Sequence, residues 1–392
     1  MSYASNYPLK TVEQIAEVKG GKRLPAGHQF ASTSTAFGYI RAQDIGGGSI
    51  ADPAVFIELD TYESLRRYRV QAGDICVTIA GNIGDIGFVK EAMEGLTLTE
   101  NAVRLTELES VDARFLAYAL QIPEVQIEMR AAAAGAAQPK LGIYKVKSVA
   151  IPVPEDLAIQ RRIVRILSSY DDLIATNQRR IALLEDAARR LYREWFVHLR
   201  FPGHESVPVK DGVPEGWEQK PLGCIAPLNY GKALKSTDRK DGKVPVYGSS
   251  GIVGTHNVAL VDSGAIVVGR KGNVGSLYFS PVPCFPIDTV YYIAPAQASY
   301  RLFLALHQLN FISSDAAVPG LNRTYAHSLS VLQPSDDVAE AFERLVRPVF
   351  EQVQQLTEQN AKLARTRDLL LPKLMSGQLD VSGIRLPEEV AA

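Results

Sequence analysis

Cysteine is scarce in this chain of 392 residues, where only Cys76, Cys224 and Cys284 occur. An odd number of widely spaced thiols matches neither a disulfide framework nor a CxxC metal site. Histidine is also sparse, and none of the six histidines form an HxxxH or HExxH pair. Pairs of that spacing place two metal ligands on one face of a helix. We therefore predict separate, reduced thiols and no metal site.

A net charge of either sign is missing too, because 42 Lys and Arg balance 43 Asp and Glu. Proteins that bind nucleic acid often carry a basic surplus on one face. The surplus here is local: residues 217–334 hold 10 Lys and Arg against 6 Asp and Glu, whereas residues 335–392 hold 7 against 10. The composition therefore neither supports nor excludes a nucleic-acid ligand.

Long apolar runs are also absent. No stretch approaches the roughly 20 apolar residues that span a bilayer. The N-terminal MSYASNYPLK contains no basic region followed by an apolar run. We expect no signal peptide, no membrane segment and a cytoplasmic location.

Sequence signatures of catalysis are missing as well. No GxxxxGK[ST] P-loop is present, and no GxGxxG opens a helix after a strand. The loop of Asn-Pro-Pro-Tyr type with which an amino-methyltransferase holds its target amine is also absent. Glu218 and Lys220 have the ExK spacing of some nucleases, with Asp211 upstream, but these three lie across a linker and the first strand of a domain. We predict a chain without a catalytic site.

The chain does contain an internal repeat, the strongest signal in the sequence. Three pairs of blocks recur in the same order in the two halves. Residues 73–88 match residues 264–279 at seven of 16 positions without a gap, and residues 136–154 match residues 316–334 at six of 19. Each half then runs into a long helical segment, so the chain reads as two copies of one domain plus one helix. The blocks are VEQIAEVKGGK (12–22) with LGCIAPLNYGK (222–232), GDICVTIAGNIGDIGF (73–88) with GAIVVGRKGNVGSLYF (264–279), and AAQPKLGIYKVKSVAIPVP (136–154) with AAVPGLNRTYAHSLSVLQP (316–334).

Each copy reads as an α+β domain with short strands. Brief β-branched runs that end at glycines, such as ICVTIAG and IVVGRKG, predict strands. FLAYALQI (115–122) and YRLFLALHQL (300–309) each predict one amphipathic helix. We predict a first domain at 1–154, a central long helix at 155–200, a linker at 201–216, a second domain at 217–334, a distal long helix at 335–380 and a C-terminal tail at 381–392.

Heptad spacing marks both helical segments, and such spacing keeps one seam facing a partner helix. Neither segment shows a second apolar face for a globular core, so we predict an antiparallel coiled coil in which Asn177 fixes the register. Two amphipathic helices in separate cores are the alternative. A helix of about 35 residues is roughly 50 Å long, which exceeds one DNA turn of roughly 34 Å. The predicted pairing residues are Ile163, Ile166, Tyr170, Leu173, Asn177, Leu184, Ala187 and Leu191 in the first segment, and Phe342, Val349, Leu356, Leu363 and Leu370 in the second.

In the order and duplication of its pieces, nearly the whole chain resembles the specificity subunits of type I restriction-modification systems. The first copy departs from the second, because it has GNIGDIG after an apolar TIA where the second has GRKGNVG. The pieces that carry the resemblance are VAIPVPEDLAIQRRIVRIL (149–167), WEQKPLGCIA (217–226), VPVYGSSGIVG (244–254) and IVVGRKGNVG (266–275).

The resemblance implies a non-catalytic subunit with two target-recognition domains, each of which reads one half of a bipartite site in double-stranded DNA. It implies that the helices set the gap between the half-sites and dock two modification (methyltransferase) subunits. Restriction (motor and nuclease) subunits would join the larger complex. S-adenosylmethionine and ATP would bind these partners, so we expect no cofactor on this chain.

Polar residues in glycine-flanked loops are the candidate DNA contacts. Glycine lets a backbone approach DNA closely, and Arg, Lys, Asn and Ser donate to phosphates or base edges. A solvated basic turn is the alternative in each case. The candidates are Lys232, Lys235, Tyr247, Ser249, Ser250, Arg270, Lys271, Asn273, Asn322 and Arg323 in the second domain, and Lys22, Arg23, Arg41, Gln43, Asn82, Asn101 and Lys140 in the first.

Three other functions remain compatible with these residues. A stand-alone DNA-binding regulator would use the heptad helices to form a homodimer. A catalytic nucleotide-binding protein would bind a cofactor as an isolated chain. A type I-like reader in another methylation-based defence system would differ only in its partners.

Overall fold

The computed structural model of the protein describes residues 5–133, 139–311 and 320–381. The chain forms two compact units: a first unit of residues 1–175 and 360–392, and a second unit of residues 176–359. The borders between the units fall inside two long helices, α5 (Leu157–Tyr192) and α9 (Asp336–Met375). Each unit therefore contains one segment of each long helix.

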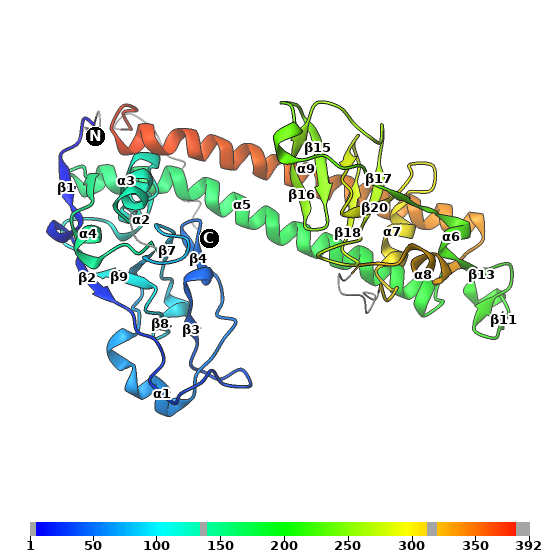
Figure 1. Ribbon diagram of the computed structural model, residues 1–392, viewed down its shortest axis with the longest axis horizontal. Coiled ribbons are helices and arrows are strands. Elements are labelled where there is room, and N and C mark those ends of the chain that lie inside the picture. Colours follow the sequence, from blue (N-terminus) through cyan, green and yellow to red (C-terminus); the bar gives the residue numbers. More distant parts are fainter. Residues whose placement is uncertain (1–4, 134–138, 312–319, 382–392) are drawn as a thin grey trace. The chain divides into compact units, whose positions relative to one another are not determined.

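A four-stranded antiparallel sheet in the order β2-β9-β6-β7 lies at the centre of the first unit (Figure 1). Its strands are β2 (Glu17–Gly20), β6 (Ile75–Thr78), β7 (Ile86–Phe88) and β9 (Ala102–Thr106). Ile75 and Val77 pack with helices α2 (Ala113–Ala119) and α3 (Pro123–Ala133), while Cys76 packs into a second cluster that contains Leu98. Burial on both faces explains why β6 is a continuous apolar run instead of an alternating one.

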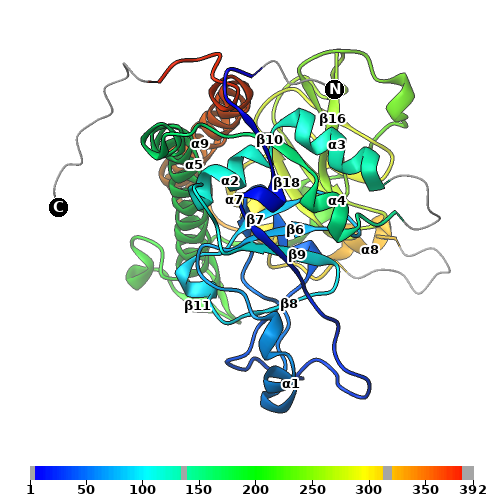
Figure 2. The same ribbon diagram turned by 90° about the vertical axis from the view of Figure 1, so that its left-hand side faces the viewer.

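Smaller elements complete the first unit, and α1 lies far from α5 in both views (Figure 1, Figure 2). The strand pairs are β1 (Leu9–Thr11) with β10 (Ala150–Pro152), β3 (Tyr39–Ile40) in parallel with β8 (Thr97–Leu98), and β4 (Ile45–Gly46) with β5 (Ser49–Ile50). The helices are α1 (Leu59–Ser64) and α4 (Ile143–Lys147), with 3-10 turns η1 (Val12–Gln14), η2 (Ala42–Asp44), η3 (Arg66–Tyr68) and η4 (Glu91–Met93).

The second unit contains a four-stranded antiparallel sheet in the order β14-β20-β17-β18. Its strands are β14 (Leu228–Tyr230), β17 (Ala265–Gly269), β18 (Leu277–Ser280) and β20 (Val290–Ile293). Other strands are β11 (Val209–Lys210), β12 (Val213–Pro214), β13 (Glu218–Pro221), β15 (Val244–Gly248), β16 (Gly251–His256), β19 (Phe285–Pro286) and β21 (Ser330–Gln333). The helices are α6 (Leu222–Ile225), α7 (Tyr300–Leu306) and α8 (Arg323–Ser328), with short turns η5 (Arg193–Val197), η6 (His204–Ser206) and η7 (Ser236–Asp238).

One topology occurs twice. The order β14-β20-β17-β18 repeats β2-β9-β6-β7, and the antiparallel pair β13–β21 repeats β1–β10. The parallel pair β15–β19 likewise repeats β3–β8. The predicted α+β class with a duplicated domain is therefore confirmed. The two predicted domain helices are shorter than expected, and α2 begins earlier because Asp112 caps it by accepting from the N–H groups of Arg114 and Phe115.

The long helices pack against the domain cores, and the prediction that they have no second apolar face is wrong. In the first unit, Ile163 and Leu167 of α5 and Leu374 of α9 lie in one buried cluster with Phe115. In the second unit, Tyr192 of α5 and Phe342 of α9 lie in a buried cluster that also contains Trp195 and Trp217. The sequence pattern misled because these core contacts use only the ends of the helices.

The seam of α5 differs from the predicted seam at its intermediate positions. Leu173 is 40% exposed and Ala187 is also exposed, whereas Ile174 is half-buried and Ala188 is buried. Residues three apart and residues four apart both lie on one face of a helix. The sequence pattern therefore allowed either residue of each neighbouring pair to lie in the seam. Ile166 is half-buried against the core of the first unit. Of the other predicted pairing residues, Ile163, Asn177, Phe342 and Leu356 are buried, and Tyr170, Leu184, Leu191, Val349, Leu363 and Leu370 are half-buried.

Polar pairs join the two helices within each unit. In the first unit, Arg367 pairs with Asp171, and Asn360 Nδ2 donates to the Ile174 carbonyl (3.4 Å). In the second unit, the amide of buried Asn177 donates to Gln359 Oε1 (3.2 Å). Asp171 of α5 meets Arg367, whereas Ile174, later in α5, meets Asn360, earlier in α9. The helix segments therefore run antiparallel in the first unit. The ring contact of Tyr192 with Phe342 extends this order in the second unit.

The segment predicted as a linker packs against the second unit. Phe201 is buried, and its ring centroid lies 4.7 Å from that of Trp217. Strands β11 and β12 form a small hairpin within the same segment. The segment is therefore anchored by Phe201 and the hairpin, although most of its residues are exposed.

Candidate nucleic-acid interface

Two strands of the second unit end at one edge of the sheet. Tyr230, the last residue of β14, pairs with Tyr291, and Gly269, the last residue of β17, pairs with Val290. Tyr291 and Val290 are neighbours at the start of β20. The chain therefore leaves β14 and β17 at the same place, which we call the β14–β17 edge.

The loop after β17 is a tight turn that presents polar side chains outward. Gly272 and Gly275 have positive φ angles of 74° and 76°, which glycine adopts without strain. A Cβ on Gly275 would lie only 2.8 Å from the Cβ of Phe311. Lys271 and Asn273 are exposed on this loop, where the sequence predicted DNA contacts.

The turn after β15 lies against this loop. Ser276 Oγ donates to the Ser249 carbonyl (2.7 Å), and Tyr278 donates to the same oxygen (3.3 Å). Ser249 is half-buried and Ser250 is exposed. Two predicted segments that are far apart in the sequence thus meet at the β14–β17 edge.

Tyr247 does not reach that surface, although the sequence predicted it as a DNA contact. Its side chain is only 6% exposed and packs with Val261, Val267 and Cys284. Burial raises the pKa of its hydroxyl. The register of β15 with β16 shifts between Val246 and Tyr247, and a bulge of this kind changes the face that the next side chain occupies.

The start of α8 also reaches the β14–β17 edge. Leu321 N–H donates to the Arg270 carbonyl (2.8 Å), which places exposed Arg323 near the loop after β17. Asn322 Oδ1 accepts from Tyr325 N–H (3.0 Å), so this exposed side chain caps the helix. Helix capping is therefore a structural role for Asn322 beside the predicted contact with DNA.

Tyr230 is a residue of this edge that the sequence interpretation missed. Its ring is 47% exposed, and the Cζ atoms of Arg270 and Arg323 lie 5.0 Å and 4.9 Å from the ring centroid. The sequence signal that could have identified Tyr230 was an aromatic residue at the end of a strand, directly before the Gly-Lys pair of LNYGK.

Lys232 belongs to the same edge, whereas Lys235 lies farther along the chain. Lys232 N–H donates to the Pro286 carbonyl (3.1 Å), and its side chain is exposed. It follows Gly231, where a Cβ would lie 2.1 Å from the Ile287 carbonyl oxygen. Lys235 is exposed before the turn η7 and has no described contact with the edge.

The first unit has an equivalent edge, which we call the β2–β6 edge. The Ile79 carbonyl accepts from Leu141 N–H (2.8 Å), as the Arg270 carbonyl accepts from Leu321 N–H. A bridge between Ala80 and Lys140 likewise repeats one between Lys271 and Gly320. The predicted contacts at or beside this edge, all exposed or half-buried, are Lys22, Asn82, Asn101 and Lys140.

In the first unit, Arg41 and Gln43 occupy the position that corresponds to the turn after β15 in the second unit. Thr99 N–H donates to the Ile40 carbonyl just as Ile287 N–H donates to the Tyr247 carbonyl. Arg41 is engaged within the protein, because its guanidinium lies 3.0 Å from the buried carboxylate of Asp44. The hydrogen bond with Asp44 raises the pKa of Arg41. Gln43 is exposed.

Arg23 is 76% exposed, and its Nε lies 3.6 Å from Glu100 Oε1. An ion pair this exposed holds its partners weakly. Arg23 is therefore available to an external anion beside Lys22.

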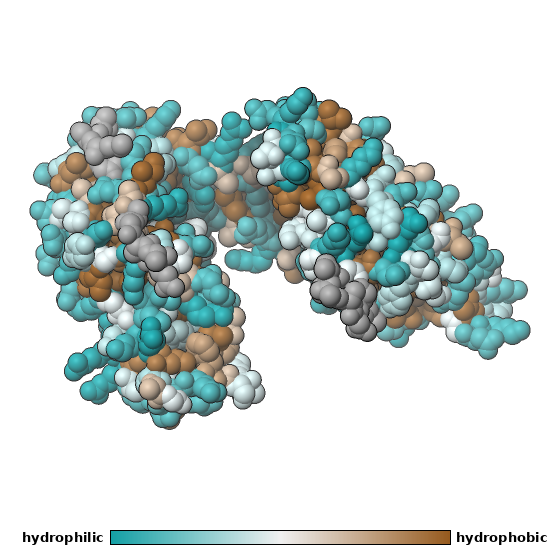
Figure 3. Space-filling model, viewed as in Figure 1, coloured by the Kyte–Doolittle hydropathy of each residue, from teal (hydrophilic) through white to brown (hydrophobic). Residues whose placement is uncertain are grey.

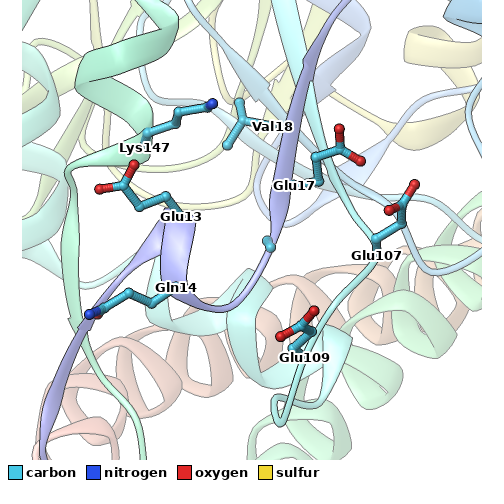
Figure 4. A pocket seen from close by; sticks show the side chains of 8 residues that line it. Glu13, Gln14, Glu17, Val18, Glu107, Glu109 and Lys147 are labelled. Carbon is cyan, nitrogen blue, oxygen red and sulfur yellow. The ribbon is translucent and has the colours of Figure 1, made fainter.

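The first unit also has a hollow lined by carboxylates, in contrast to the β2–β6 edge (Figure 4). Lys19 lies 2.7 Å from both Glu17 and Glu107, and the hydrogen bond that Lys19 donates to Glu107 lowers the pKa of that carboxyl. A hollow lined mainly by carboxylates repels phosphate, so we do not place DNA here. The acidic residues that line the hollow are Glu13, Glu17, Glu107 and Glu109.

Within residues 5–133, 139–311 and 320–381, no group of three or more His, Cys, Asp or Glu is placed to hold a metal ion. Cys76 and Cys284 are buried and Cys224 is exposed. Burial raises the pKa of the Cys76 thiol and keeps it protonated. No helix in the described part of the chain is long and apolar enough to cross a membrane.

Apolar side chains reach the surface over the long helices, where they are mixed with hydrophilic ones (Figure 3). Leu173 and Leu369 are exposed in the first unit, and Leu183 and Leu345 in the second. Exposed leucines on a helix are candidates for contact with another protein.

Comparison with known proteins identifies the family. The family model of the type I restriction modification DNA specificity domain matches residues 5–186 and 214–329. The chain is similar to the type I restriction enzyme MjaIX specificity subunit of Methanocaldococcus jannaschii, with 25% identity over 329 residues, which cover 76% of each protein. It is also similar to the type I restriction enzyme HindI specificity subunit of Haemophilus influenzae, with 21% identity over 62% of this chain and 71% of that protein.

The fold matches a solved structure, the S subunit of a type I restriction-modification system from M. genitalium. The TM-score is 0.58 at 19% identity, and the match covers 97% of this chain and 98% of that one. The family model covers well over half of the chain, and each matched segment contains one of the two sheet edges. The chain therefore belongs to the family of type I restriction-modification DNA specificity subunits, as a DNA-recognition subunit that is not itself an enzyme.

Proposed function

We propose that this subunit reads a bipartite site in double-stranded DNA, one half with each unit. The β2–β6 edge would read one half and the β14–β17 edge the other. The observation that carries this proposal is the convergence, at the same edge in both units, of polar loops that are distant in sequence. Lysine, asparagine, serine and glutamine side chains on such loops have the hydrogen-bonding groups that contact phosphates and base edges.

The long helices would dock two modification (methyltransferase) subunits and set the spacing between the half-sites. Exposed Leu173, Leu183, Leu345 and Leu369 support a protein-binding role for the helices. Buried Asn177, paired with Gln359, supports a fixed register, because a polar pair in a helix seam disfavours shifted pairings. Restriction subunits would join this complex, and S-adenosylmethionine and ATP would bind the partner subunits.

The test is methylome sequencing of a host that expresses this chain with its neighbouring methyltransferase, compared with a strain from which the chain is deleted. We expect a methylated motif of two short half-sites with an unspecified gap, present only when the chain is expressed.

A methylome that is identical with and without the chain, while the methyltransferase is shown to be active, would contradict the proposal. A stand-alone DNA-binding regulator would then be the better reading. Purification of the chain as a stable homodimer without partners would point the same way.

A further inference from the structure

We propose that Tyr230 is a positioning residue that holds Arg270 and Arg323 as one phosphate clamp at the β14–β17 edge, and that the first unit has no such clamp. This inference rests on the proposed function and deepens it. It assigns two of the phosphate contacts of the second half-site to Arg270 and Arg323.

The cluster is a cation–π arrangement centred on the Tyr230 ring, and the Cζ atom of Arg270 also lies 5.6 Å from the centroid of the Tyr291 ring. The Cζ atoms of Arg270 and Arg323 lie 5.0 Å and 4.9 Å from the centroid of the Tyr230 ring. Both distances are within the range of about 6 Å at which a guanidinium is attracted to an aromatic face. A half-exposed ring therefore holds side chains that arrive from two different elements, the loop after β17 and the first turn of α8.

The base of the cluster is fixed by hydrogen bonds. Tyr291 packs edge-on against Tyr230, with ring centroids 5.1 Å apart, and its hydroxyl donates to the Leu321 carbonyl (3.0 Å). One guanidinium nitrogen of Arg270 donates to the Asp288 carbonyl (3.3 Å). The Arg270 guanidinium is thus held by a hydrogen bond, whereas the Arg323 guanidinium is held by the Tyr230 ring.

The two cations remain available to an external anion. Within the described part of the chain, neither Arg270 nor Arg323 takes part in an ion pair with a carboxylate. Arg323 is exposed and Arg270 is half-buried. Guanidinium groups bind phosphate oxygens in a planar, directional way, and a pair held at a fixed separation suits successive backbone phosphates. Asp288 is exposed beside Arg270, so the clamp has one acidic neighbour.

The first unit lacks the clamp at the equivalent positions. Gly20 pairs with Val103 as Tyr230 pairs with Tyr291, so glycine and valine replace the two tyrosines. Ile79 occupies the place of Arg270, and its backbone hydrogen bond is the same. Ile143 occupies the place of Arg323, and its Cδ1 would lie 3.4 Å from a Cβ on Gly20. An apolar contact therefore closes the site at which the second unit holds two cations.

The experiment measures how the complex of this chain with its methyltransferase binds a DNA duplex that carries the methylated motif, at several salt concentrations. We expect Tyr230→Ala to weaken binding about fivefold, because the loss of one cation–π platform loosens both guanidiniums. Tyr230→Phe keeps the ring and should remain within about twofold of the parent protein. Arg323→Ala should reduce the slope of log affinity against log salt by about 1.

A double-mutant cycle separates positioning from independent contacts. If Tyr230 acts through the two arginines, Tyr230→Ala weakens binding less in Arg323→Ala than in the parent protein, and adds little once both Arg270 and Arg323 are alanine. Full additivity, or an unchanged salt slope in Arg323→Ala, would overturn the proposal. Arg347→Ala is the matched control, because Arg347 also lies over a tyrosine ring, 5.9 Å from the centroid of Tyr300, but on α9.

If no bipartite motif exists, the proposed function fails before any duplex is designed. If the motif exists and Tyr230→Ala binds and discriminates like the parent protein, only the clamp is refuted. Thermal unfolding of each variant would show whether a loss of binding reflects a loss of fold. Variants with normal melting temperature and weak binding support the clamp.

Discussion

Asp74 and Arg104 form an ion pair inside the first unit. The Arg104 Nη1 and Asp74 Oδ2 atoms are 2.9 Å apart, and the two side chains are 10% and 4% exposed. The second unit has Ala265 and Tyr292 at the equivalent positions, because Val267 pairs with Tyr292 as Cys76 pairs with Arg104. At this place in the fold, the first unit thus has a charged pair and the second unit has an uncharged pair.

We predict that Asp74→Ala alone destabilises the first unit by about 3–5 kcal/mol, because it leaves Arg104 buried without its partner. The double variant Asp74→Ala with Arg104→Tyr copies the second unit and should recover most of this loss. Hydrogen exchange of peptides from β6 and β9 measures both. A double variant as unstable as Asp74→Ala would contradict the prediction.

His327 contributes a pH-dependent contact to the second unit. Its Nε2 accepts a hydrogen bond from Leu228 N–H (2.9 Å), which requires a neutral ring nitrogen. Burial, and then the nearby charge of Arg323, lower the pKa of His327 below its usual 6.5. The unfolded chain therefore binds the proton more readily than the folded one. The contact stabilises the second unit fully above pH 6.5, and this contribution is lost as the pH falls through the lower pKa of the folded state.

We predict that the second unit becomes easier to unfold with urea as the pH falls from 7.5 to about 5.5, and that His327→Gln removes this part of the dependence. Glutamine keeps an acceptor oxygen but does not titrate. Tryptophan fluorescence reports this unit, since both tryptophans of the chain, Trp195 and Trp217, lie in its core. An equal pH dependence in the parent protein and in His327→Gln would rule out this role.

At the scale of elements, neighbouring residues of α5 face different partners. Ile174 is half-buried, and its carbonyl accepts from Asn360 of α9, whereas Leu173 is 40% exposed. Helix pairing and the docking of another protein can therefore be separated by substitutions one residue apart.

We predict that Ile174→Asp destabilises the first unit by about 1–2 kcal/mol, because it places a charge against α9. Leu173→Asp should change stability by less than about 0.5 kcal/mol, but it should weaken binding of the methyltransferase subunit. Thermal unfolding and co-purification with the methyltransferase measure the two effects. A large loss of stability in Leu173→Asp would place that residue in the seam after all.

At the scale of the whole molecule, the duplicated fold could be predicted because it depends on local chemistry. Gly81 and Gly84 recur as Gly272 and Gly275, since each tight turn requires positive φ. The error at Tyr247 arose because a bulge in β15 decides which way that side chain faces, and no local pattern announces it. Tyr230 was missed because its contacts are with arginines that are distant in the sequence.

The unit structure also predicts how specificity is partitioned. We expect that replacement of residues 1–154 by the first recognition domain of another specificity subunit changes one half of the methylated motif and leaves the other half unchanged. Each edge is built from the strands of its own unit, so neither edge depends on the other. Methylome sequencing of the hybrid measures this, and a change in both halves would contradict it.

The hydrogen bonds that hold Arg270 to Leu321 and Ile79 to Leu141 join main-chain atoms only. These two hydrogen bonds therefore form equally well with an arginine or with an isoleucine at this position. If the edges read DNA as proposed, we expect that a few substitutions there change the recognised DNA sequence while the fold is kept.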